Sequence, residues 1–60
     1  MSEFVTLADY KGWAIVWQSS SGKLFVRRGM GGYDNHDFYE RPRDRITAIA
    51  IAKDWIDRRR

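Results

Sequence analysis

The sequence predicts an α+β fold, in which a small antiparallel sheet of three to four strands is followed by one C-terminal amphipathic helix packed on one face of the sheet. Three observations support this. Short runs of β-branched and aromatic residues alternate with glycine- and serine-rich turns over the first two thirds of the chain. After Pro42 the apolar period changes from 2 to 3.6 residues. Finally, 60 residues have room for a single domain, 1–60.

Two strands joined by a tight loop form the centre of the predicted sheet. Residues 13–18 (WAIVWQ) and 23–28 (KLFVRR) are rich in β-branched and aromatic side chains, and Ser19–Gly22 between them has the length and composition of a hairpin loop. A shorter run over 4–7 predicts a preceding strand, closed by the turn-like segment DYKG.

The four-residue loop also predicts the register of this hairpin. The opposed pairs are then Trp17 with Leu24, Ile15 with Val26, and Trp13 with Arg28. One face is therefore nearly all apolar and is expected to lie against the helix. Alternation places a mixed set of side chains on the other face: Ala14, Val16, Gln18, Lys23, Phe25 and Arg27.

The segment after the hairpin is rich in glycine. Gly29–Gly32 (GMGG) is expected to break regular structure, because three of its four residues lack a side chain. A last strand is predicted over 37–41 (DFYER), ending at Pro42 because proline cannot donate to a strand ladder.

A helix is predicted over 46–58. Its apolar side chains fall within about 160° of arc at 100° per residue: Ala48, Ile49, Ile51, Ala52, Trp55 and Ile56. The charged ones occupy the opposite side: Lys53, Asp54, Asp57 and Arg58. Thr47 is the predicted N-cap, which makes Ile46 and Ile51 a hydrophobic staple, with Asp44 as the alternative cap.

Composition restricts what can stabilise this chain and where it resides. There is no cysteine, which excludes disulfides and thiolate metal sites, and nine large aromatic rings supply much of the burial. The core is small, so self-association as a homodimer would add stability. Because no apolar run approaches the roughly 18 residues of a membrane span and the first residues lack the pattern of a signal peptide, we expect a cytoplasmic protein without a membrane partner.

Catalytic residue patterns are scarce. The single histidine, His36, lies between Asp34 and Asp37, and this cluster offers weak ligands to a divalent ion. Its spacing fits no calcium or zinc motif, so a turn stabilised by its own side chains is the favoured interpretation. No base lies near Ser19–Ser21 in the sequence, and GMGG precedes the helix by about fifteen residues, too far for a phosphate loop. We therefore expect no enzyme, no cofactor and no metal.

Charge and aromatic content indicate binding instead. Residues 1–40 carry four basic and five acidic side chains, whereas 41–60 carry seven basic and three acidic ones. A solvated tail that complements the helix dipole is the favoured interpretation of Arg58–Arg60. Aromatic and arginine side chains dominate binding hot spots, and basic–aromatic sheets also bind nucleic acid. The predicted partner-binding residues are Lys23, Phe25, Arg27, Tyr39, Arg41 and Arg43.

Two resemblances bear on the partner. A hairpin that begins Gly12-Trp13, a further strand, and a helix with Thr47, Ala50, Ala52 and Trp55 resemble, over about residues 12–58, the arm-type DNA-binding domains of phage integrases and their plant transcription-factor relatives. That resemblance implies a sheet laid in the major groove. It would place Lys23, Arg27 and Arg41 near DNA.

The second resemblance is one of size and composition. A cysteine-free, aromatic-rich chain of about 60 residues is similar to small phage accessory proteins, anti-CRISPR proteins among them. This implies a non-catalytic phage-type inhibitor or adaptor that covers a surface of a bacterial nucleic-acid-handling or defence complex. The alternative is a sequence-tolerant DNA- or RNA-binding module that uses the open face of its sheet.

Overall fold

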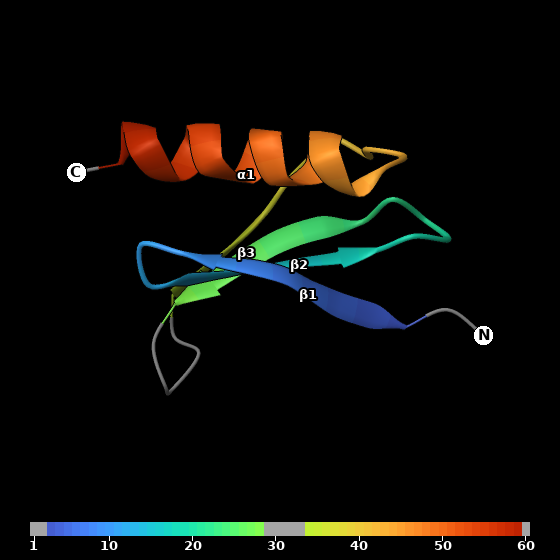
Figure 1. Ribbon diagram of the computed structural model, residues 1–60, viewed down its shortest axis with the longest axis horizontal. Coiled ribbons are helices and arrows are strands. Elements are labelled where there is room, and N and C mark those ends of the chain that lie inside the picture. The colour runs from blue at the N-terminus through green and yellow to red at the C-terminus, as the bar shows by residue number, and fades with distance from the viewer. Residues whose placement is uncertain (1–2, 29–33, 60) are drawn as a thin grey trace.

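A four-stranded antiparallel sheet carries one helix on one of its faces (Figure 1). The computed structural model describes residues 3–28 and 34–59. Its elements are β1 (Phe4–Tyr10), β2 (Trp13–Gln18), β3 (Leu24–Arg28), β4 (Asp34–Asp37) and α1 (Arg45–Arg58). The strand order β1-β2-β3-β4 follows the chain, and each neighbouring pair is antiparallel. The predicted α+β fold class is confirmed. None of the described helical residues forms a segment long and apolar enough to cross a bilayer.

The register of the β2–β3 hairpin is the predicted one. The Cα partners include Trp13 with Arg28, Ile15 with Val26, and Trp17 with Leu24. The connecting loop closes with a hydrogen bond of 2.8 Å from the Gly22 N–H to the Gln18 carbonyl. Gly22 has φ +76°, a left-handed conformation that glycine adopts without steric cost.

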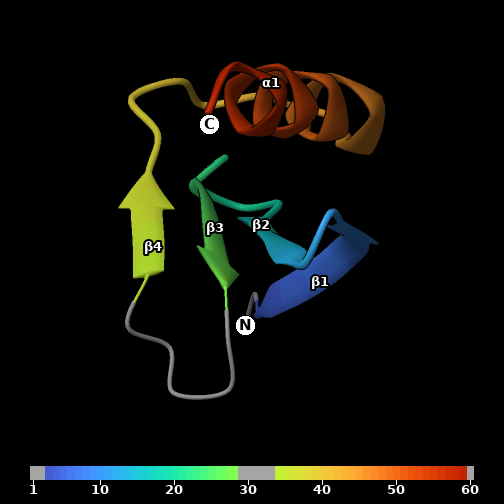
Figure 2. The same cartoon turned by 90° about the vertical axis from the view of Figure 1, so that its left-hand side faces the viewer.

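The core lies between α1 and the apolar face of the sheet. Its members come from β2, β3, the segment after β4, and the helix: Trp13, Ile15, Trp17, Leu24, Val26, Phe38, Ala48, Ala52 and Ile56. Ala48 and Ala52 are both 0% exposed, so the helix approaches the strands closely where its side chains are smallest. The helix packs over β1, β2 and β3, and Figure 2 shows β4 standing to one side of it.

The first strand is longer than predicted. It continues past residue 7 to Tyr10, with a register irregularity between Thr6 and Ala8. A bulge of this kind lets a strand continue while its side chains are re-aimed. Asp9 and Tyr10 therefore pair with β2 instead of forming the start of the turn, which the structure confines to Lys11 and Gly12.

The prediction of a last strand over 37–41 is wrong, because β4 is Asp34–Asp37. The polar segment DNHD forms a strand because its inward side chains have partners. The His36 ring stacks on Trp55 at 4.4 Å between centroids, and Asp34 accepts a hydrogen bond of 2.7 Å from Arg28. The chain leaves the sheet after Asp37, where Phe38 turns into the core and its N–H donates to the Leu24 carbonyl. The turn interpretation of DNHD is therefore also wrong.

The helix begins at Arg45 and is capped by Asp44, the alternative cap, and not by Thr47. The Asp44 carboxylate accepts a hydrogen bond of 2.7 Å from the Thr47 N–H. Ile46 consequently lies in the first turn with 82% of its surface exposed, so the predicted staple with Ile51 does not form. The predicted break at Gly29–Gly32 and the last arginine, Arg60, lie outside the described residues.

Candidate binding surfaces

One face of the sheet packs on α1, and within residues 3–28 and 34–59 no element covers the other (Figures 1 and 2). We call this uncovered side the open face. The observed registers bring side chains from all four strands to it: Phe4, Thr6, Asp9, Ala14, Val16, Phe25, Arg27, Asn35 and Asp37. Val16 is buried there, between Thr6 and Phe25 on the neighbouring strands, so part of this face is already shielded from water by its own side chains.

A hollow of about 390 Å³ lies in the open face. Its lining residues are Phe4, Lys23, Phe25, Arg27, Asn35 and Asp37. The rings of Phe4 and Phe25 meet edge to face with 5.6 Å between centroids, although Phe4 remains 45% exposed. Cations and a carboxylate surround this aromatic pair, since Asp37 is the cross-strand partner of Phe25.

Three of the six predicted partner-binding residues meet in this hollow: Lys23, Phe25 and Arg27. The others that line it, Phe4, Asn35 and Asp37, were not predicted. Phe4 was not predicted because no pattern in the sequence sets the register of the first strand. Asn35 and Asp37 were missed because the last strand was predicted three residues too late.

The remaining predicted residues, Tyr39, Arg41 and Arg43, lie away from the open face, in the connection between β4 and α1. Tyr39 is 98% exposed. Nη1 of Arg41 donates to the carbonyls of Phe38, Tyr39 and Glu40 at 2.8, 3.3 and 3.2 Å, which holds this connection in place. Arg41 and Arg43 line a second hollow together with the Ser19–Gly22 loop.

The histidine cluster is split by the alternation of β4. Asp34 and His36 lie on one side of the strand, and Asn35 and Asp37 on the other. The structure, over the residues that it describes, contains no group of three or more side chains able to hold a metal ion. His36 instead packs on Trp55 and Phe38 beside a third hollow of about 300 Å³ between β4 and α1.

The groups with shifted pKa values hold the fold together. The Tyr10 hydroxyl and the Lys11 ammonium both donate to Asp57, at 2.9 and 2.8 Å. The hydrogen bonds from Lys11 and Tyr10 hold the pKa of Asp57 below its ordinary value, and the bond to Asp57 raises the pKa of both donors. The backbone N–H of Thr47 likewise lowers the pKa of Asp44. Each of these shifts is explained by a contact that ties the helix to the sheet or caps it.

Arg58 and Arg59, the two C-terminal arginines that the structure describes, both make specific contacts. Arg58 pairs with Asp54 at 3.2 Å, one turn earlier on the same helix. The Arg59 guanidinium lies over the rings of Trp55 and Trp13, at 4.8 and 5.2 Å from their centroids, and Arg28 lies over Trp13 at 4.9 Å. Cation–π contacts therefore seal this end of the core.

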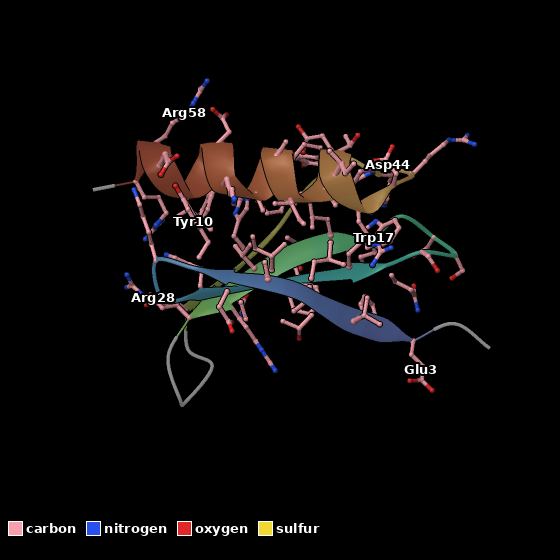
Figure 3. All side chains as sticks on the ribbon, viewed as in Figure 1. Glu3, Tyr10, Trp17, Arg28, Asp44 and Arg58 are labelled. Carbon is pink, nitrogen blue, oxygen red and sulfur yellow. The ribbon has the colours of Figure 1, made fainter. Side chains whose placement is uncertain are left out.

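Among the described residues, side chains therefore line an aromatic hollow on the open face, an arginine–serine hollow beside the start of α1, and a hollow that includes His36. Figure 3 draws the side chains as sticks on the ribbon. Comparison with known proteins adds nothing to this description, because no protein-family model, curated protein or solved structure gives a significant match.

Proposed function

We propose that this chain is a non-catalytic binding protein whose open face docks on a partner protein. The proposed class of partner is a bacterial nucleic-acid-handling or defence complex, which a phage-type inhibitor or adaptor of this size would cover. The observation that supports docking is the Phe4–Phe25 pair, an aromatic contact that lines a hollow in a sheet face that no described element covers. Aromatic anchors with a polar rim are typical of protein interfaces.

The charges around the pair favour a protein over a nucleic acid. Lys23 and Arg27 are basic, but Asp37 lies on the same rim, directly across from Phe25. A phosphate backbone would be attracted by the first two side chains and repelled by the third. A protein surface can supply complementary groups of both signs.

Nucleic-acid binding is the second candidate, and a different observation supports it. Arg41 and Arg43 lie just before the start of α1, and both are exposed. Neither arginine lies on the open face, so docking by that face does not use them. A nucleic acid held by them would bind mainly through its phosphates, and its affinity would fall steeply as the salt concentration rises.

Affinity capture from a bacterial lysate, quantified by mass spectrometry, tests the docking proposal. Immobilised wild type and Phe25→Ala are compared with Ile46→Ala, a matched control that also truncates an apolar side chain, one that is 82% exposed on the helix. We expect a protein that wild type and the control both enrich and that Phe25→Ala loses at least about tenfold, the effect of one hot-spot residue.

Two results would contradict the proposal. One is an identical set of enriched proteins for all three baits. The other is a large fall in the melting temperature of Phe25→Ala, because Phe25 would then belong to the core and its loss would unfold the bait. Fluorescence anisotropy with short duplex DNA, single-stranded DNA and RNA at rising salt tests the second candidate. A logarithm of the binding constant that falls linearly with the logarithm of the salt concentration would favour nucleic acid.

A further inference from the structure

The second hollow lies at the end of the molecule where α1 begins. It has a volume of about 410 Å³ and is lined by Ser19, Ser20, Ser21, Gly22, Arg41, Pro42 and Arg43. Two segments far apart in sequence form it: the β2–β3 loop, and the connection that leads into the helix. Figure 1 shows them next to one another at that end.

The walls of this hollow are held by specific contacts. The buried indole N–H of Trp17 donates to the Pro42 carbonyl at 3.0 Å, which ties the connection to β2. Gly22 approaches the same segment so closely that a Cβ on it would lie 3.1 Å from the Pro42 carbonyl oxygen and from the Arg41 Cβ. The hollow is therefore formed before any ligand arrives, which lowers the entropic cost of binding.

The lining is rich in hydrogen-bond donors and positive charge. Two guanidinium groups and the Ser19 hydroxyl line it, whereas the Ser21 hydroxyl already donates to Oε1 of Gln18 at 2.6 Å and accepts from the Lys23 N–H at 3.2 Å. None of the described lining residues carries a carboxylate. Arg41 is oriented through Nη1, which donates to the backbone carbonyls of residues 38–40, and a guanidinium has further N–H groups on its other two nitrogens. The adjacent carboxylate, Asp44, accepts the Thr47 N–H in capping the helix.

We propose that this hollow binds a phosphate group. Several donors arranged around one space suit a tetrahedral oxyanion with several acceptor oxygens, and guanidinium groups bind phosphate with matched geometry. No aromatic ring lines the hollow among the residues described, so the phosphate is recognised and an attached base is not stacked. The site is separate from the open face and does not depend on the docking proposal.

The source of the phosphate is either a free phosphate or the phosphodiester of a nucleic acid. Titration of the ¹⁵N-labelled chain with inorganic phosphate, and separately with an oligothymidylate that lacks terminal phosphates, distinguishes the two. Binding in either arm should first shift the amide signals of residues 19–22, Arg41 and Arg43, together with the side-chain Nε signals of both arginines. A response to the oligothymidylate that exceeds the response to phosphate would assign the diester.

Arg43→Gln is the decisive variant, and Arg45→Gln is its matched control. Both remove one positive charge from an exposed arginine near the start of α1, but only Arg43 lines the hollow. Loss of one charged hydrogen bond is expected to weaken binding about tenfold in Arg43→Gln and little in Arg45→Gln. Ser19→Ala, which leaves all charges in place, should weaken binding by a smaller factor.

The proposal is overturned if neither ligand shifts residues 19–22, or if the shifts are spread over both ends of the helix. It is also overturned if the two arginine variants weaken binding equally, because the attraction would then be a diffuse charge effect. Melting temperatures show whether each of the three variants is folded. If Arg43→Gln is unstable, Ser19→Ala still tests the proposal.

Discussion

Replacing Trp55 by alanine should remove a large part of the stability of this domain. The side chain joins the helix to the sheet: its ring packs edge to face on Trp13 at 5.2 Å, stacks on His36 at 4.4 Å, and meets Phe38 at 5.8 Å between centroids. Loss of these contacts also removes one of the two rings under the Arg59 guanidinium.

The magnitude follows from burial and ring contacts. A tryptophan buries about 150–250 Å², worth about 4–6 kcal/mol at about 25 cal/mol per Å² when burial is complete. Trp55 is only partly buried, which lowers this to about 2–3 kcal/mol, and lost ring pairing adds about 1 kcal/mol. A loss of about 3–4 kcal/mol compares with a total of about 3–9 kcal/mol for a domain of this length.

Urea unfolding followed by circular dichroism measures this loss. Trp55→Phe keeps a ring in the same place and should lose about 1 kcal/mol, whereas Ile46→Ala, which truncates an exposed side chain of the same helix, should unfold as the wild type does. An unchanged urea midpoint for Trp55→Ala would refute this prediction, because it would mean that this face of the helix does not pack against the sheet.

Gly22→Ala should cost about 2 kcal/mol, since the new methyl group is placed in a left-handed conformation and also 3.1 Å from Pro42; Gly12→Ala, with φ +86° and open space around it, should show the backbone cost alone. Equal melting temperatures for the two variants would contradict the close approach of Gly22 to Pro42. The ion pair of Asp57 with Lys11 predicts two pH limits: the lowered pKa of Asp57 gives stability that is lost as pH falls below about 4, and the raised pKa of Lys11 gives stability that is lost above about pH 10. In melting temperatures measured over a series of pH values, Asp57→Asn should show a smaller loss of stability at low pH and at high pH than the wild type shows. An unaltered dependence of the melting temperature on pH would contradict the contribution of this ion pair.

The parts of the fold that the sequence predicts correctly are those with a strong apolar period. The β2–β3 register follows from loop length and alternation, and the inward face of α1 follows from a repeat of about 3.6 residues. Both signals are local and numerous, so a single unusual residue does not alter them.

Individual side-chain contacts decide the position of the last strand, which was predicted wrongly. β4 has no apolar alternation, and its place is set by His36 on Trp55 and by Asp34 on Arg28, neither of which is visible in a local pattern. Because the last strand ends at Asp37, Tyr39 and Arg41 lie outside the sheet. The predicted binding residues are therefore divided among three hollows: Lys23, Phe25 and Arg27 line the first, Arg41 and Arg43 the second, and Tyr39 the third.

The order of the strands also has a kinetic consequence. Because β1-β2-β3-β4 follows the chain, every strand pairs with its sequence neighbour, and hairpins of this kind form in about 1–10 μs. The contacts that span the chain are those of the helix, such as Tyr10 with Asp57, 47 residues apart. Docking of α1 should therefore be the late, slower event in folding, and a chain still being synthesised would hold a partly formed sheet until the residues of α1 emerge.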